Sequence, residues 1–240
     1  APLVVFVHGA TIDHHEWDAT LPLVAERNRV LTLDVRSHGL SRPAPFNIAA
    51  AKADLLALLD ELQVQQATFV GHSMGGNLIQ ELAFHHPGRV KALVFVDCTH
   101  NFQKLSAAEK FGLSLAVPIF KLYPYQTLVD QSLTVTALLK ASQDLLRQSM
   151  GSLGKDEFIQ IMMATSACLH EEPGYTIGKP MLMILGDKDR TGNIRKVMPQ
   201  SAAIEPHCRL VIVTQALHAP NLDAPELFHR ELLEFLVQTS

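Results

Sequence analysis

A serine flanked by glycines is the first feature of this sequence that could do chemistry. The stretch at 70–76, VGHSMGG, follows a short apolar run and precedes a segment with the apolar spacing of a helix. At a tight turn between strand and helix, a serine sits in strained backbone with its hydroxyl exposed, and nearby glycines avoid a Cβ clash. The pattern predicts Ser73 as a nucleophile. The alternative is a glycine-rich turn that only happens to contain serine.

A serine hydroxyl is a weak nucleophile and needs a general base, which in turn needs a group to orient it. Such groups should lie in loops at the carboxyl ends of strands, where parallel α/β sheets bind ligands. Asp189 and His218 each follow an apolar run of strand length. Ser73, Asp189 and His218 then follow one another in the order serine, acid, histidine. One known fold combines this order with a serine at a tight strand-to-helix turn. We expect His218 to take the Ser73 proton and Asp189 to orient His218.

The developing charge on a substrate oxygen needs backbone donors close to the serine. The Met74 amide would begin the new helix, and the Ala10 amide lies in the loop after the first strand, so the two are the predicted oxyanion donors. Asp97 also ends an apolar run of strand length and is a second candidate acid; the alternative is a helix cap. His72 and His100 either line the pocket or form hydrogen bonds at its rim.

Apolar runs of strand length alternate with segments of helical spacing. The runs are apolar on both faces, as is typical of parallel strands buried between two helix layers. We expect strands at 3–7, 29–35, 67–70, 91–96, 181–185 and 209–213, and helices that include 14–26, 47–62 and 223–239. Asp223 and Glu226 have the spacing of a capping box for the last helix. The predicted fold class is α/β, with a doubly wound, mostly parallel sheet.

The alternation stops after Cys98. Residues 99–172 contain helical patterns interrupted by prolines and glycines, and no run that resembles a strand. We therefore expect a core made of residues 1–98 and 173–240, with a helical insertion at 99–172. Met162 and Met163 could line a pocket beneath this insertion, since thioether side chains adapt to varied ligands, although packing within the insertion is the alternative.

Five motifs together resemble the α/β-hydrolase family of the esterase, haloperoxidase and lactonase type. They are Phe6-Val7-His8-Gly9, Asp34-x-Arg36-x-x-Gly39-x-Ser41, Gly71-His72-Ser73-Met74-Gly75-Gly76, Gly186-x-x-Asp189 and His218-Ala219-Pro220. The resemblance covers essentially the whole chain and implies the α/β-hydrolase fold, with the insertion as a cap over the site. The family usually has two antiparallel strands before the His-Gly strand, which this member either lacks or has outside the given sequence.

The resemblance implies a serine hydrolase that cleaves an ester, thioester or lactone of a small to medium apolar substrate through an acyl-enzyme. Serine at position 73 argues against haloalkane dehalogenases and epoxide hydrolases, which carry aspartate there. Ala219 argues against carbon–carbon bond hydrolases and hydroxynitrile lyases, which carry tryptophan and lysine after the histidine. A cofactor-free haloperoxidase or perhydrolase would use the same triad. A receptor-like member with little turnover is the remaining alternative.

Composition argues against several other classes. The 240 residues carry a net charge of −4 without a basic run, which disfavours a nucleic-acid partner. No apolar stretch approaches the roughly 18–20 residues of a membrane span, and we expect no signal peptide. Three scattered cysteines suggest a reducing, cytoplasmic location. The 12 histidines lack regular ligand spacing, so we expect no metal and no cofactor. The expected partner is a small-molecule substrate; the oligomeric state stays open.

Overall fold

One parallel sheet of six strands organises the structure, a computed structural model that describes residues 1–240. The strands lie in the order β2-β1-β3-β4-β5-β6, and each neighbouring pair is parallel. They are β1 (Leu3–Val7), β2 (Arg29–Leu33), β3 (Ala67–His72), β4 (Val90–Val96), β5 (Met181–Gly186) and β6 (Cys208–Val213). The predicted α/β class and the six predicted strands are confirmed, with ends that differ by one or two residues at most.

Strand β1 shows why the strands read as continuous apolar runs. Side chains alternate between the two faces of a sheet, and Val5 packs in the larger of two hydrophobic clusters while Val4 and Phe6 pack in the other. All five β1 residues are buried. A strand covered on both faces has no position at which a polar side chain would meet water, so its sequence does not alternate.

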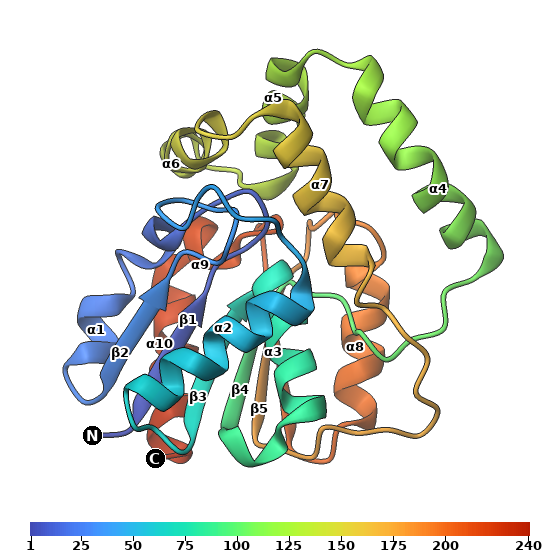
Figure 1. Cartoon of the computed structure of the whole chain (residues 1–240). Helices are drawn as coiled ribbons and strands as arrows, with labels where there is room; N and C mark the ends of the chain where they lie inside the picture. The colour runs from blue at the N-terminus through green and yellow to red at the C-terminus, as the bar shows by residue number, and fades with distance from the viewer.

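Helices cover both faces of the sheet (Figure 1). The larger cluster joins one face to α2 (Ile48–Glu61), α3 (Met74–His85) and α8 (Ile194–Ile204). The smaller cluster joins the other face to the 3-10 helix η1 (His14–Trp17), α1 (Leu21–Ala25) and α10 (Pro225–Gln238). Two short elements, η2 (Pro87–Arg89) and α9 (Pro220–Asp223), lie in connections. This arrangement is the doubly wound architecture that the sequence predicts.

Four further helices stand between β4 and β5 in the chain. They are α4 (Ala107–Leu122), α5 (Tyr125–Thr136), α6 (Lys140–Gly151) and α7 (Lys155–Ser166). In Figure 1 they lie above the upper end of the sheet, beyond the carboxyl ends of the strands. Since ligands of parallel α/β sheets bind at that end, these helices are placed to border a site there.

Two helices differ from the prediction. The expected helix at 14–26 is divided into η1 and α1, because Pro22 in the first turn of α1 has no N–H with which to continue a preceding helix. The last helix begins at Pro225, and Asp223 does not cap it. Instead, the Asp223 carboxylate accepts hydrogen bonds from the Leu138 and Leu217 N–H groups, at 2.8 and 2.9 Å. The predicted capping box is therefore wrong, and Asp223 links the insertion to the loop that carries His218.

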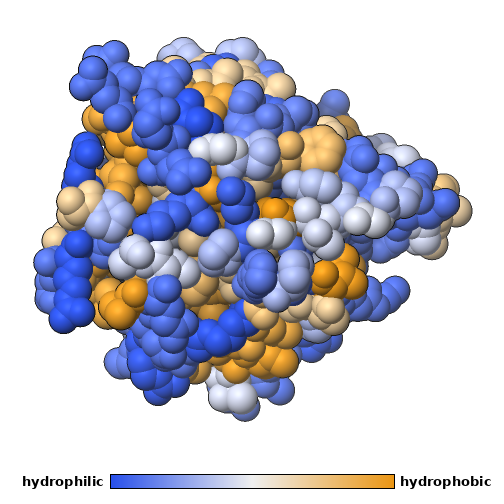
Figure 2. Space-filling model, turned by 90° about the horizontal axis from the view of Figure 1, so that it is seen from below, coloured by the Kyte–Doolittle hydropathy of each residue, from blue (hydrophilic) through white to orange (hydrophobic).

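The outer surface differs between the two ends of the sheet. Figure 2 shows the lower face, on which hydrophilic side chains separate the apolar areas from one another. Large exposed apolar side chains gather along α4, namely Phe111, Leu115, Ile119 and Leu122. None of the helices is both long enough and apolar enough to cross a membrane.

Candidate active site

The turn between β3 and α3 holds Ser73 in a strained conformation, with φ 49° and ψ −114°. A Cβ on Gly71 would lie 2.6 Å from the backbone of Gly75, and a Cβ on Gly75 would lie 2.2 Å from the Val7 carbonyl oxygen. Both positions therefore require glycine. The Ser73 N–H donates to the Val96 carbonyl at 2.9 Å, which fixes the turn to β4.

A chain of hydrogen bonds connects Ser73 to two buried side chains. His218 Nε2 lies 2.9 Å from Ser73 Oγ, and His218 Nδ1 lies 3.2 Å from Asp189 Oδ2. The other Asp189 oxygen accepts the Thr191 N–H at 2.7 Å. Burial raises the pKa of Asp189, but the His218 charge and these hydrogen bonds outweigh it, and the pKa lies below its ordinary value. An ionised Asp189 can hold His218 with Nε2 directed at the serine.

The sheet topology explains why these three residues meet. The chain moves from β1 outward to β2 and then returns to the other side of β1 with β3, so the loops after β1 and β3 diverge. Such a switch point opens a crevice at the carboxyl ends of the strands. Strands β5 and β6 are parallel neighbours with Gly186 opposite Val213, so the loops that follow them, with Asp189 and His218, run side by side.

The two predicted oxyanion donors come from different parts of the chain. Met74 follows Ser73 directly and is the first residue of α3, where N–H groups lack intrahelical partners. Ala10 lines a cavity of about 90 Å³ together with Ser73 and His218. Both positions are compatible with the oxyanion role, which stays a prediction.

Two buried histidines hold the loop after β1 against the loop after β2. His8 Nε2 accepts the Val35 N–H at 3.0 Å, and His38 Nε2 accepts the Thr11 N–H at 3.0 Å. Burial lowers the pKa of His38 to about 3, so its ring is neutral and can act as an acceptor. His8, the histidine of the His-Gly motif, therefore acts as a hydrogen-bond acceptor for a backbone N–H group. Together with His38 it holds the loop that contains Ala10.

Asp97 has a role that differs from the predicted cap. The Gly186 N–H lies 3.1 and 3.0 Å from its two carboxylate oxygens, and the Asp97 side chain forms a hydrogen bond with Asp189. Burial and the charge of Asp189 raise the pKa of Asp97 well above its ordinary value, which favours the protonated form that can donate to Asp189. The capping interpretation is wrong, because the Asp97 carboxyl group binds the Gly186 N–H and lies beside Asp189.

A buried ion pair beneath the site was missed from the sequence. His72 Nδ1 lies 2.6 Å from Glu16 Oε1, and the exposed fractions of the two side chains are 2% and 0%. The other Glu16 oxygen accepts the Gly9 N–H at 3.1 Å, and Nε2 of His72 donates to the His218 carbonyl at 2.8 Å. The pair thus connects the loop of the predicted oxyanion donor to the loop of the predicted base.

The electrostatics favour the charged form of this pair. Burial lowers the pKa of His72, but the Glu16 charge and hydrogen bonds outweigh it and leave the pKa above its ordinary value. Burial likewise raises the pKa of Glu16, and the His72 charge reverses the shift. Two charges removed from water stabilise a fold only when each is well paired. Here the charges lie 2.6 Å apart, and Gly9 and the His218 carbonyl supply further hydrogen bonds, whereas His72 Nδ1 lacks hydrogen-bond geometry toward Glu16.

A second, larger cavity of about 490 Å³ opens on the other side of Ser73. The insertion contributes Leu113 from α4 and Met162 from α7 to its walls. Of the residues predicted to line a pocket, Met162 and His72 border Ser73, whereas Met163 and His100 line neither of the two cavities. Of the two roles considered for these methionines, pocket lining therefore applies to Met162 and not to Met163.

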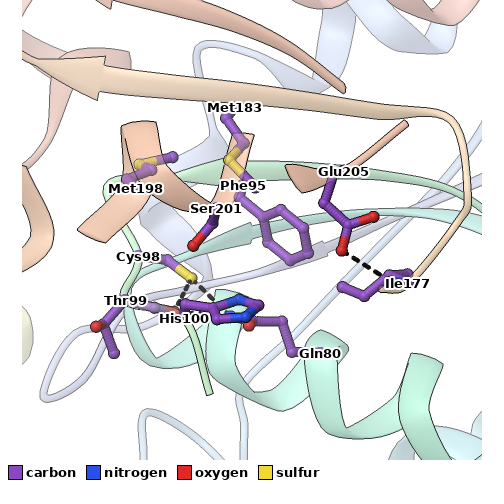
Figure 3. Close-up of a pocket in the computed structure, with 10 residues that line it drawn as sticks. All are labelled: Gln80, Phe95, Cys98, Thr99, His100, Ile177, Met183, Met198, Ser201 and Glu205. Atoms are coloured by element: carbon purple, nitrogen blue, oxygen red, sulfur yellow. Dashed lines mark hydrogen bonds between the residues drawn. The ribbon is translucent and has the colours of Figure 1, made fainter. Parts of the chain in front are cut away.

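A narrow crevice lies behind the larger cavity, where β4 meets α3 and α8 (Figure 3). Its volume is about 10 Å³, which is the space of about one water molecule. Cys98 lines it and is held by a hydrogen bond from Gln80 Nε2 at 3.0 Å. Burial raises the pKa of the Cys98 thiol. A buried, protonated thiol does not compete with Ser73 as a nucleophile.

Two groups of side chains have the ligand types of a metal site. Asp97, Asp189 and His218 form one, and their donor atoms hydrogen-bond to one another as described. Asp13, His14 and His15 form the other at the surface, where His15 Nδ1 lies 3.0 Å from Asp13 Oδ1. Hydrogen bonds account for these positions without a metal ion, and in the second group His14 Nδ1 binds the Asp34 carboxylate at 2.7 Å.

Comparisons with known proteins bear on the family and the fold. A family model described as alpha/beta hydrolase fold matches residues 2–225. Non-heme chloroperoxidase CPO-A1 from Kitasatospora aureofaciens is 27% identical over 256 residues, which cover 97% of this chain and 91% of that protein. A crystal structure of the enol-lactonase from Burkholderia xenovorans LB400 has a TM-score of 0.84 at 23% identity, covering 99% of this chain and 92% of that one. The last similarity bears on the fold alone.

A higher identity occurs over a shorter segment. A protein of Mycobacterium phage D29, whose name places it among non-heme haloperoxidases, is 40% identical over 100 residues. This segment covers 40% of this chain, and the chain spans 36% of the length of that relative. The match therefore supports family membership, and the activity of the whole relative is not transferred to this chain.

Proposed function

Because this chain belongs to the alpha/beta hydrolase fold family, we propose that it is a serine hydrolase that cleaves a carboxylic ester, thioester or lactone through an acyl-enzyme on Ser73. The observation that carries the proposal is the hydrogen-bonded chain from Ser73 through His218 to Asp189, with separations of 2.9 and 3.2 Å. Nucleophile, base and orienting acid lie within the reach that such catalysis needs.

The first half of the reaction forms the acyl-enzyme. Ser73 Oγ attacks the carbonyl carbon while His218 Nε2 takes the hydroxyl proton, and the carbonyl electron pair moves to its oxygen. The Met74 and Ala10 N–H groups stabilise that oxyanion, and Asp189 stabilises the imidazolium. As the intermediate collapses, the bond to the leaving oxygen breaks, and His218 gives its proton to that oxygen. The product alcohol departs and the acyl group stays on Ser73.

The second half repeats these steps with water. His218 removes a proton from a water molecule whose oxygen attacks the acyl carbon, and the same two N–H groups bind the oxyanion. Collapse breaks the bond to Ser73 Oγ, which recovers its proton from His218. The products are the free acid and the starting enzyme.

The insertion at 99–172 acts in this proposal as a cap on the core formed by 1–98 and 173–240. Its support is that α4 and α7 supply walls of the larger cavity, through Leu113 and Met162. A cap that limits water around the serine strengthens the electrostatic interactions within the site. We also propose a cytoplasmic location, which agrees with the three free cysteines.

The test is the rate of ester hydrolysis by Ser73→Ala. We expect kcat for p-nitrophenyl acetate to fall by roughly 10⁴–10⁶ while the thermal unfolding transition stays in place, because only the nucleophile is removed. Gly151→Ala is a suitable control, since a Cβ at this exposed position meets nothing within 4 Å. A Ser73→Ala enzyme with a tenth of the original kcat would exclude Ser73 as the nucleophile.

Haloperoxidase-type turnover is a second candidate, favoured by the similarity to the chloroperoxidase. Hydrogen peroxide would replace water in the second half-reaction, and the acyl-enzyme would yield a peroxy acid able to oxidise bromide. The two candidates differ in one measurement, the ratio of peroxyacetic acid to acetic acid formed from methyl acetate in the presence of hydrogen peroxide. A ratio near zero at millimolar peroxide supports hydrolysis alone.

A further inference from the structure

Ser73 lies at the boundary between two cavities of unequal size. The larger has a volume of about 490 Å³ and the smaller about 90 Å³. Ser73, Met162 and Thr191 line both. An ester has one group on each side of its carbonyl carbon, so a substrate in contact with Ser73 would place one group in each cavity. The question is which group enters which cavity.

The position of His218 decides this. His218 lines the smaller cavity and does not line the larger one. In the proposed mechanism, its Nε2, 2.9 Å from Ser73 Oγ, must give a proton to the leaving oxygen. The leaving oxygen therefore faces His218, and the alcohol attached to it extends into the smaller cavity. The acyl group then occupies the larger cavity.

The volumes limit the size of each group. A buried apolar cavity of about 150 Å³ accommodates benzene, which has six heavy atoms. On that scale the smaller cavity holds about three or four heavy atoms and the larger about twenty. The acyl side can thus be several times larger than the alcohol side.

The residues that line the two cavities agree with this assignment of the alcohol and acyl groups. Ile12, Val135 and Met150 give the smaller cavity an apolar wall, and it has no carboxylate, lysine or arginine. The larger cavity combines apolar Leu113 with polar Asn77 and, at α4, the Glu109 carboxylate. A short aliphatic alcohol suits the first lining, and a long apolar acyl group with a polar atom suits the second.

We propose, on the basis of the serine hydrolase function above, that the preferred substrates are esters of short alcohols, of about one to four carbons, with a larger acyl group. Val135 on α5 limits the alcohol side, and the surface of α4 around Gly112 limits the acyl side. Selectivity for the two halves of the substrate is therefore divided between two helices of the insertion.

The test uses two ester series and the intact protein. In the first, the acyl group is hexanoyl and the alcohol varies from methyl through butyl to octyl. In the second, the alcohol is methyl and the acid varies from acetic to decanoic. We expect kcat/KM to fall about 10-fold or more from butyl to octyl hexanoate, because one excess methylene in a closed pocket costs about 10-fold or more. Methyl decanoate should be cleaved at least as well as methyl acetate.

Two variants separate the cavities. Val135→Phe fills the smaller one from an exposed position, 37% accessible, so the fold should tolerate it. It should lower the butyl-to-methyl ratio about 10-fold and leave the decanoate-to-acetate ratio unchanged. Gly112→Phe is placed where a Cβ meets nothing within 4 Å. It should lower the decanoate-to-acetate ratio and leave the butyl-to-methyl ratio unchanged. Val237→Phe, at an exposed position of α10, is the matched control and should change neither ratio.

The possible outcomes distinguish this inference from the function on which it depends. Efficient cleavage of octyl hexanoate with rejection of methyl decanoate would overturn the assignment of the two cavities. A Val135→Phe effect confined to the acyl series would also overturn it. If none of the esters is cleaved and a fluorophosphonate does not label Ser73, the serine hydrolase proposal fails, and the substrate assignment fails with it.

Discussion

Two helices that border the same cavity, α3 and α4, differ in how they are held. Ten of the 12 residues of α3 are buried, and its first turn follows Ser73 directly. None of the 16 residues of α4 is buried, and Phe111 and Leu122 are 65% and 82% exposed. Figure 1 shows α4 at the outer edge of the helices above the sheet. The nucleophile is therefore built on the most enclosed helix and the cavity wall on the least enclosed one.

The difference follows from what each helix must do. A serine with positive φ keeps its conformation only when its surroundings leave no alternative, and contacts at Gly71 and Gly75 provide that constraint. A cavity wall must admit substrates of different shapes, and a helix with few buried contacts can shift at a low free-energy cost. The nucleophile thus lies in a tightly packed region, and a wall that selects the substrate lies in a loosely packed one.

After Ser73, the largest effect within the enclosed region should come from Asp189. Asp189→Asn removes the charge that orients His218 and should lower kcat by roughly 10²–10⁴. Asp97→Asn is its matched control. Because the raised pKa of Asp97 favours its neutral form, an asparagine amide can replace it as donor to Asp189 and acceptor from the Gly186 N–H, so we expect less than about a 10-fold loss. A larger loss for Asp97→Asn than for Asp189→Asn would make Asp97 the catalytic acid.

The Glu16–His72 pair should show the next largest effect, on stability. Glu16→Gln leaves a buried histidine without its counterion and should cost about 3–5 kcal/mol of unfolding free energy. Urea unfolding measures it, and the double variant Glu16→Gln/His72→Gln should recover part of the loss. A single variant as stable as the parent would show that the pair is not charged.

The pH dependence of that loss has a defined sign. The pKa of Glu16 is lowered from 4.5, so its contribution is present above about pH 4.5 and disappears as the pH falls through the lowered value. The pKa of His72 is raised from 6.5, so its contribution is full below about pH 6.5 and disappears as the pH rises through the raised value. The difference between parent and Glu16→Gln should therefore be greatest between about pH 4.5 and 6.5.

The comparison of helices also predicts a contrast between two leucines. Leu82 on α3 is fully buried, and Leu82→Ala should cost about 2–5 kcal/mol. Leu115 on α4 is 41% exposed, and Leu115→Ala should change the unfolding free energy by less than about 0.5 kcal/mol. Equal losses at the two sites, measured by urea unfolding, would mean that α4 is packed as firmly as α3.

The sequence predicts best those features whose signal is local. The strands are continuous apolar runs, and the loops after them carry Ser73, Asp189 and His218, so the sheet alone brings these residues to one end. The turn glycines point to the serine because their lack of a Cβ is a steric requirement within a few residues. Fold class and the three candidate site residues could be predicted for this reason.

Features that depend on distant partners could not be predicted. Glu16 stands beside Trp17 in an expected helix, and nothing near it in the chain indicates that His72 is its partner. Asp97 resembles a helix cap until the approach of Gly186 and Asp189 is known. The spacing of the apolar residues of α4 indicates a helix, but it does not indicate which face of the helix other elements cover. Periodicity contains no information about neighbouring elements.

The most direct test of the central claim is to trap the acyl group on the enclosed serine. Enzyme mixed with p-nitrophenyl acetate and quenched in acid should gain the mass of one acetyl group, and peptide mapping should place it on Ser73. The Ser73→Ala variant should gain none, whereas Leu115→Ala on α4 should be acetylated like the parent. Acetylation of another residue, or hydrolysis that proceeds in Ser73→Ala at the parent rate, would contradict the account.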